Sequence, residues 1–249
     1  MAVATLKHDG IPLYVQLEEI FAERIAIGEW AVNETIPNEM ALCKEFQVSR
    51  GPVRQALDHL VRKGLLHRKQ GKGTMVLPPK VENHLSDFYS FTKLIERRNK
   101  QPTIQLLSFD TVPAEKYATN YLKLSAGSNI FKLRRLRLAD NEPLIAETIY
   151  LPYDICPELS PVEVVGPSLY ELLRERYGVN LVHSKHYFEP TVANEFEAGV
   201  LGVTINTPML LLETITYTYG DHPIVFSKAV MRGDRVRYYV ELNAPIDSP

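Results

Sequence analysis

The stretch SRGPVRQALDHLVRKGLLHRKQGKGT, residues 49–74, decides the fold of the N-terminal part of the chain. Its first half carries apolar residues at helical spacing, and its second half has the pattern of a short hairpin with Gly71 and Gly73 at the tip. Seven Lys or Arg side chains stand against one acid, Asp58, which is a local charge of +6 in a chain whose net charge is −2. Because the positive charge is local, we expect an anionic partner to be contacted here.

Three helices are expected between residue 12 and about residue 63. Apolar residues recur at helical spacing over 12–27, which predicts an amphipathic helix, and Asn38 can cap a shorter helix over 39–46. A tight connection then leads to Ser49, a second N-cap candidate, and to a helix that runs to about Lys63. Two short helices joined by a tight turn predict a helix-turn-helix unit.

The second of these short helices has the features of a helix that fits the major groove of DNA. Arg50 and Arg54 lie four residues apart on its outward face, and Pro52 suits the first turn, where backbone N–H groups have no helical partner. The basic hairpin after it can lie against phosphates or enter the minor groove. The alternative is a basic face that contacts solvent alone. We predict that DNA is contacted by Ser49, Arg50, Pro52, Arg54, Lys69, Gly71, Lys72, Gly73 and Thr74.

The composition is that of a folded protein with two domains or with one large one: 249 residues, of which 45% are apolar and 23% charged. No run approaches the roughly 18 apolar residues of a membrane-spanning helix. The first residues lack the apolar core of a signal peptide, so a cytoplasmic location without membrane contact is expected. Cys43 and Cys156 have no metal-binding spacing and are interpreted as buried apolar residues. No metal or cofactor is predicted.

The chain after residue 84 has the pattern of strands with interspersed helices. Pro78 and Pro79 cannot continue a ladder, so we predict a linker over 78–84 between a domain at 8–77 and a domain at 85–249. Strand hairpins with helices between them predict an antiparallel sheet in an α+β domain. The predicted strands are 104–112, 130–139, 144–151, 181–188, 209–219, 224–231 and 236–242, and the predicted helices are 113–122, 168–177 and 193–201.

Charged residues recur within the predicted strands. Arg135 and Arg137 alternate onto one face of a strand, and Glu147 lies in the partner strand of the same hairpin. One interpretation is a surface ion pair of little energetic value. The other is that two guanidiniums converge on an anionic ligand while Glu147 orients an Arg or accepts from a hydroxyl. His183 and His186, three residues apart in a strand, point to opposite faces and so do not predict a metal site.

Residues 13–76 resemble the winged helix-turn-helix domain of the GntR family of bacterial transcription regulators. The motifs that carry the resemblance are Ile36-Pro37-Asn38-Glu39, the run from Val48 to Leu57, Gly64-Leu65-Leu66 and Gly71-Lys72-Gly73-Thr74. The second half is similar to the UTRA effector-binding domain of the HutC subfamily. Here the matching residues are Phe91-Thr92, the run from Lys132 to Arg137, Glu147, Tyr150-Leu151-Pro152, Ser168-Leu169-Tyr170 and the run from Arg232 to Arg235.

This resemblance implies a homodimeric repressor that binds a palindromic operator in double-stranded DNA and is released by a small anionic metabolite, a phosphorylated sugar or a carboxylate. It also implies a chorismate-lyase-like sheet, in agreement with the α+β prediction. Val225 stands where several sugar-phosphate-binding relatives carry Glu, which argues against an amino-sugar phosphate. The residues that the resemblance implies at the effector are Phe91, Thr92, Arg135, Arg137, Glu147, Ser168 and Tyr170.

Two alternatives to a repressor stay open at this point. An enzyme of chorismate-lyase type with an appended DNA-binding module would need a nucleophile with its base, a metal cluster or a Gly-rich phosphate loop, and the sequence contains none of these patterns. We therefore predict no catalytic residues and no enzymatic activity. An activator differs from a repressor in where its operator lies, which the amino-acid sequence does not encode.

Overall fold

The computed structural model describes residues 6, 10–69, 71–84, 91–166 and 168–241. The chain divides into two compact units, one of residues 1–80 with 233–235 and one of residues 81–232 with 236–249. The division between Lys80 and Val81 falls inside the stretch 78–84, for which we expected a linker. Residues 81–84 are a strand, β3 (Val81–His84), which pairs in parallel with β10 (Val236–Tyr239). The expected linker therefore ends in an ordered element.

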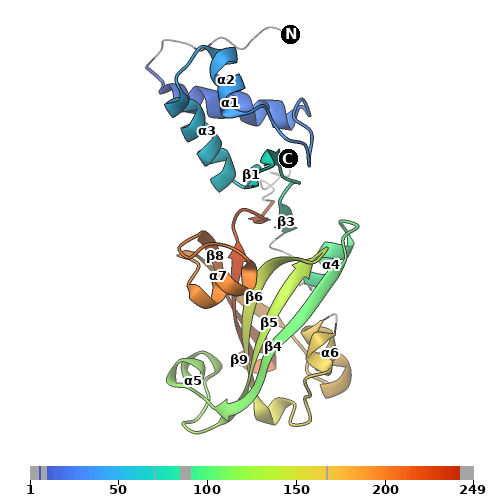
Figure 1. The fold of residues 1–249 in the computed structure, drawn as a ribbon. Helices are drawn as coiled ribbons and strands as arrows, with labels where there is room; N and C mark the ends of the chain where they lie inside the picture. Colours follow the sequence, from blue (N-terminus) through green and yellow to red (C-terminus); the bar gives the residue numbers. More distant parts are fainter. Residues whose placement is uncertain (1–5, 7–9, 70, 85–90, 167, 242–249) are drawn as a thin grey trace, which may run out of the picture. The chain divides into compact units, whose positions relative to one another are not determined.

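The first unit contains three helices and a two-stranded hairpin (Figure 1). The elements are α1 (Leu13–Ala26), α2 (Glu39–Phe46), α3 (Arg50–Arg62), β1 (Leu66–Lys69) and β2 (Gly73–Val76). Apolar side chains from all three helices and from both strands form one core. The helical spacing seen in the sequence thus becomes a buried stripe on each helix. These are the helices and the hairpin expected from the sequence, in the same order.

The two N-caps predicted from the sequence differ in the structure. Asn38 accepts a hydrogen bond from the Ala41 backbone N–H at 2.9 Å, as expected of a cap. Ser49 is the N-cap residue of α3, as predicted, and has the extended backbone of that position, but its side chain makes no capping hydrogen bond. The reason lies in Pro52, which occupies the third helical position and has no N–H to donate to the Ser49 hydroxyl.

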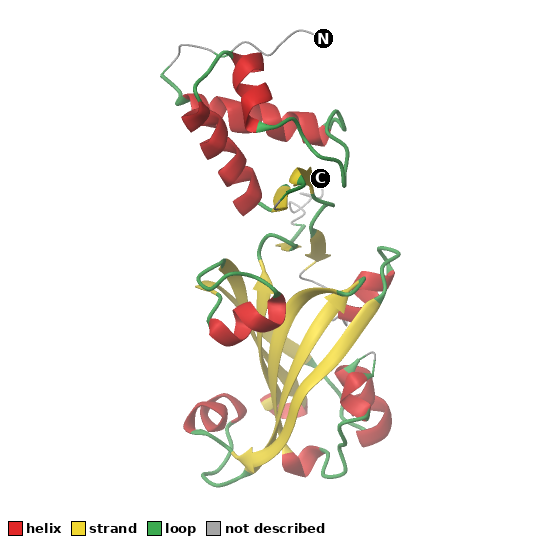
Figure 2. Ribbon diagram, viewed as in Figure 1, coloured by secondary structure: helices red, strands yellow, loops and turns green. Residues whose placement is uncertain are grey.

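The second unit is built on a six-stranded antiparallel sheet in the order β4-β5-β6-β9-β8-β7 (Figure 2). All six strands were predicted, and the turns between β5 and β6 and between β8 and β9 fall at Asp140-Asn141 and at Tyr219–Asp221. The α+β prediction is confirmed. The strand bounds are β4 (Pro102–Pro113), β5 (Asn129–Ala139), β6 (Glu142–Pro152), β7 (His183–Val192), β8 (Pro208–Thr218) and β9 (His222–Arg232).

Helices cover both faces of this sheet (Figure 1). The helices α4 (Phe91–Glu96) and α6 (Leu169–Tyr177) pack with apolar residues on one face, which also carries Arg135, Arg137 and Glu147. The helices α5 (Lys116–Leu122) and α7 (Glu195–Leu201) pack on the other face. The alternation of side chains along each strand assigns neighbouring residues to opposite layers.

Several element bounds differ from the sequence prediction, and one helix was not predicted. The strand predicted to end at Phe188 continues to Val192, because β7 is an edge strand and an edge tolerates Pro190. The helix predicted over 113–122 begins at Lys116, since β4 continues to Pro113. The short helix α4 was not predicted as a helix.

Candidate nucleic-acid interface and buried cavity

The outward face of α3 carries cations that have no acidic partner among the described residues. Arg50, Arg54 and Arg62 are exposed on α3, and Lys69 and Lys72 are exposed on the hairpin. None of these five side chains forms an ion pair with a residue that the structure describes. They are therefore available to an anionic partner outside the unit.

Two other cations of the same stretch are neutralised inside the unit. Arg68 pairs with Asp58 and, at 3.3 Å, with Glu39. Lys63 lies 2.6 Å from the Glu18 carboxylate, which also contacts the His59 ring nitrogen Nδ1 at 2.8 Å. The pKa of Glu18 is lowered although burial raises it, because both partners favour the charged form. The sequence count of +6 thus overstates the charge that is free to meet DNA.

The hairpin tip has the geometry that its glycines permit. Gly71 and Gly73 have φ angles of 74° and 88°, in the left-handed region, and the Lys72 N–H donates to the Lys69 carbonyl at 2.9 Å. A Cβ on Gly73 would lie 2.9 Å from the Thr35 methyl group, because residues 33–36 run alongside β2. The hairpin predicted from the sequence, with Gly71 and Gly73 at its tip, is confirmed.

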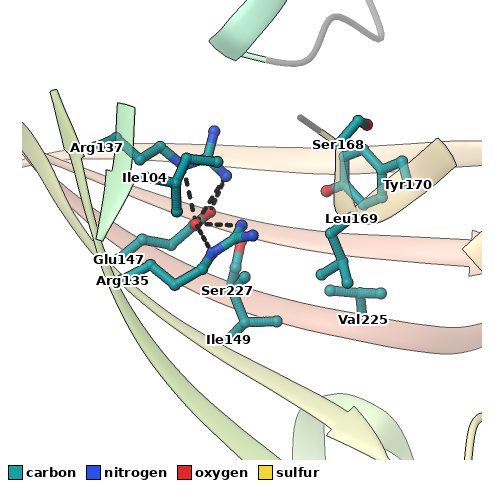
Figure 3. Close-up of a pocket in the computed structure, with 10 residues that line it drawn as sticks. All are labelled: Ile104, Arg135, Arg137, Glu147, Ile149, Ser168, Leu169, Tyr170, Val225 and Ser227. Atoms are coloured by element: carbon teal, nitrogen blue, oxygen red, sulfur yellow. Dashed lines mark hydrogen bonds and ion pairs between the residues drawn. The ribbon is translucent and has the colours of Figure 1, made fainter. Parts of the chain in front are cut away.

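The second unit contains a cavity of about 40 Å³ between the sheet and α6 (Figure 3). Residues from four strands meet there with the beginning of α6. By the criterion of roughly one water per 10–15 Å³, it has room for a few waters, so a sugar-sized molecule enters only if its walls move. The lining residues are Ile104, Arg135, Arg137, Glu147, Ile149, Ser168, Leu169, Tyr170, Val225 and Ser227.

Arg135 and Arg137 hold one carboxylate between them in this cavity (Figure 3). Arg135 donates from Nε and Nη2 to Glu147 Oε2 at 3.2 and 2.7 Å. Arg137 donates from Nε to Oε2 at 3.0 Å and from Nη2 to both oxygens, at 2.8 Å for Oε1 and 2.7 Å for Oε2. The cross-strand pair lies in the interior, so the solvent-exposed ion pair considered from the sequence is excluded.

Burial and charge act in opposite directions on this cluster. Burial favours a neutral Glu147, but attraction by Arg137 and Arg135 and their hydrogen bonds outweigh it and lower its pKa to about 2. Burial also lowers the pKa of Arg135, a residue that is 1% exposed. With both guanidiniums and the carboxylate ionised, the cluster carries a charge of +1.

Comparisons with known proteins assign each of the two units to a known domain family. The model of the bacterial regulatory proteins of the gntR family matches residues 13–76, and that of the UTRA domain matches residues 97–237. The chain is 32% identical over 232 residues to the HTH-type transcriptional repressor NagR of Bacillus subtilis (strain 168), covering 93% of this chain and 95% of that protein. The chain belongs to the GntR family.

Two further comparisons agree with this assignment. The HTH-type transcriptional regulator YurK of Bacillus subtilis (strain 168) is 31% identical over 234 residues, which is 94% of this chain and 96% of YurK. The crystal structure of PhnF from Mycobacterium smegmatis aligns with a TM-score of 0.64 at 25% identity, over 94% of this chain and all of that one. With its GntR and UTRA domains, the chain is a ligand-responsive, DNA-binding transcriptional regulator of the HutC subfamily, and not an enzyme.

Five of the seven effector residues expected in this GntR-family chain line the cavity: Arg135, Arg137, Glu147, Ser168 and Tyr170. Phe91 lies beside the cluster, with its ring 5.6 Å from the Arg137 guanidinium carbon. Thr92 is buried in α4 and is not among the lining residues. Their roles at an effector stay predictions.

Sequence reasoning missed four lining residues, namely Ile104, Ile149, Leu169 and Ser227. Ser227 had a usable signal, because it places a hydroxyl among the apolar residues of a predicted strand and faces Ile149 in the neighbouring strand. Ile104 comes from β4, on the opposite side of β5 from Glu147, and nothing in its local sequence distinguishes it from a core residue.

The remaining candidate groups have structural explanations. His183 stacks on Tyr217 with 4.5 Å between ring centroids, whereas His186 contacts Ser184 at 2.7 Å and Thr214 at 3.4 Å.

The described residues contain no group of three or more His, Cys, Asp or Glu that could hold a metal ion. No described helix is long and apolar enough to cross a membrane. Burial raises the pKa of Cys156 to about 12, and Cys43 is half-buried rather than buried as expected.

Proposed function

We propose that the chain is a repressor that binds a palindromic operator as a homodimer and is released by a small anionic metabolite, a phosphorylated sugar or a carboxylate. The observation that carries this proposal is the buried Arg135-Glu147-Arg137 cluster, whose charge of +1 borders a cavity in the UTRA domain. A positive cavity favours an anion. The relative named NagR is itself described as a repressor.

We assign DNA binding to a domain of residues 8–77, which lies within the first unit. In this proposal α3 enters the major groove with Arg50 and Arg54 toward bases or nearby phosphates, and the hairpin with Lys69 and Lys72 lies beside it. Ser49, Pro52, Gly71, Gly73 and Thr74 complete the contact surface. The Ser49 hydroxyl makes no capping hydrogen bond and is therefore available to a phosphate.

The short length of the recognition helix α3 favours a homodimer. One short recognition helix contacts too few bases to select a site in a genome, whereas two helices in a dimer read two half-sites. We assign dimerisation and effector binding to residues 85–249, after the predicted linker at 78–84, of which residues 81–84 form β3. The protein would act in the cytoplasm, where its operator lies.

Release depends on the small volume of the cavity. A cavity of about 40 Å³ is too small for a sugar-sized metabolite. Such a molecule therefore binds a conformation in which α6 and the preceding segment Glu163–Val165 have moved. The Arg135 Nη1 donates to the Val164 carbonyl at 3.0 Å, so the charged cluster is tied to that segment. The effector favours release only if it binds the DNA-incompetent dimer more tightly.

The test begins with selection of bound fragments from genomic DNA by the full-length protein. Light scattering of the complex then gives the stoichiometry, and fluorescence anisotropy gives the affinity against salt and against candidate anions. We expect two chains on a palindrome, an affinity that falls steeply with salt, and release by at least one anion that also raises the melting temperature. A monomer on a single half-site, or an affinity that is flat against salt, would contradict the proposal.

A further inference from the structure

The chemistry of the cavity wall separates into a charged side and an uncharged side (Figure 3). Arg135, Arg137 and Glu147 lie together on one side. The residues across from them include Leu169 and Val225, which are apolar, and Val225 is 1% exposed. Hydroxyl groups of Ser168, Tyr170 and Ser227 complete the wall. Among the lining residues that the structure describes, Glu147 is the only acid.

Glu147 has little capacity left for a positively charged ligand group. Its two oxygens accept five hydrogen bonds from Arg135 and Arg137, and its low pKa of about 2 reflects that pairing. An ammonium group that entered the cavity would meet a cluster of charge +1 and no free carboxylate among the described lining residues. Burying a charge without a partner is strongly unfavourable.

The donors that remain for an anion come from both sides of the cavity. The Nη1 of Arg137 makes no hydrogen bond to any residue that the structure describes, whereas the Nη1 of Arg135 is held by the Val164 carbonyl. The Ser168 oxygen accepts the Glu171 backbone N–H at 3.2 Å, which leaves its own O–H free to donate. Arg137 rather than Arg135 is therefore positioned to contact the anionic group.

We propose that the effector is an anion that carries no ammonium group, with its anionic part on Arg137 and an uncharged body of hydroxyl and hydrocarbon groups against Ser227, Ile149 and Val225. This inference rests on the proposed function of the cavity as the effector site. Val225 determines the specificity, because it presents a buried methyl surface where an ammonium would need a carboxylate. Arg135 acts as a positioning residue that fixes Glu147.

The test uses pairs of probes that differ by an amino group in place of a hydroxyl: lactate with alanine, glycerate with serine, and glucose phosphate with glucosamine phosphate. Melting temperature and operator release are measured for the full-length wild type against each pair. We expect the member without an ammonium to act at a concentration lower by about tenfold or more. Val225→Glu should shift the preference toward the ammonium-bearing member, and Val225→Gln, which adds a similar volume without charge, should not.

The outcomes separate this inference from the proposed function. If an ammonium-bearing probe releases the operator as well as its partner does in the wild type, the inference fails while the effector function stands. If no anion in the set changes melting temperature or operator binding, the effector function fails and the inference fails with it. The comparison in the wild type decides the matter even if Val225→Glu does not fold.

Discussion

Arg135 and Glu147 face each other directly across the β5–β6 hairpin, and two nitrogens of Arg135 donate to the same oxygen, Glu147 Oε2, at 3.2 and 2.7 Å. Arg137, two residues along the same face, shares that oxygen. One buried carboxylate therefore fixes two guanidiniums. Breaking such a group by removing one member leaves charges in the interior without their partner.

Removing Arg135 should destabilise the second unit strongly. Arg135→Ala leaves Glu147 with one guanidinium and frees the Val164 carbonyl, so we expect a loss of about 3–5 kcal/mol in unfolding free energy. Urea unfolding, monitored by circular dichroism, measures this loss of unfolding free energy. Arg174→Ala, which removes an exposed side chain paired with its neighbour Glu175, is the control and should change stability little. Equal losses of unfolding free energy in the two variants would show that the buried cluster stabilises the fold no more than an exposed ion pair does.

Removing Arg137 should leave the fold closer to intact and abolish the response to anions. Its side chain is 18% exposed, and Arg135 remains to hold Glu147. In Arg137→Ala the operator affinity without effector should equal that of the wild type, while anion-induced release is lost. Anisotropy titrations of the operator complex with a releasing anion measure both. Retained release at wild-type concentrations would exclude Arg137 as the contact.

Stability should fall in acid because of Glu147. Its pKa is lowered from 4.5 to about 2 in the folded state, so its contribution is fully present above about pH 4.5 and is lost as the pH falls toward 2. That shift corresponds to a contribution on the order of 3 kcal/mol. Glu147→Gln should flatten the pH dependence of unfolding in this window, whereas Glu175→Gln, an exposed residue, should not. Parallel curves for wild type and Glu147→Gln would contradict the assignment.

The basic side chains of the first unit should differ in their effect on DNA binding. Arg54→Ala and Lys72→Ala remove cations without ion-pair partners among the described residues, so each should weaken operator binding. The slope of log affinity against log salt should become shallower by about 0.9 for each phosphate that the variant no longer neutralises. Arg68→Ala is the matched control, since Arg68 is already neutralised by Asp58 and Glu39. A salt slope that changes as much for Arg68→Ala would overturn this division.

Substitution of Asn38 should lower stability, whereas substitution of Ser49 should lower DNA affinity. Asn38→Ala removes a capping hydrogen bond and should cost about 1 kcal/mol of unfolding free energy. Ser49→Ala removes no capping bond and should leave the melting temperature unchanged while weakening operator binding. Thermal unfolding and anisotropy on both variants provide the measurement. A large loss of stability in Ser49→Ala would show that its hydroxyl supports the helix after all.

Much of the fold was predictable because its signals are local. Helical spacing identified α1, α2 and α3, and glycines placed the hairpin tip, since both depend on residues close in sequence. Alternation along β5 placed Arg135 and Arg137 on one face, and the hairpin turn at Asp140-Asn141 brought Glu147 opposite Arg135. Misplaced bounds occurred where a neighbouring strand decided the outcome, as at Pro190 on the sheet edge.

The sequence by itself determined that cations gather over residues 49–74 and that two guanidiniums share a strand face with one carboxylate close by. Only the tertiary structure decided which of these charges are free. Arg68 and Lys63 are neutralised by acids from other helices, and Glu147 pairs with both guanidiniums in a cavity that Ile104, Val225 and Ser227 also line. The physical reason is that ion pairing and desolvation depend on distances between segments far apart in the chain, which local spacing does not encode.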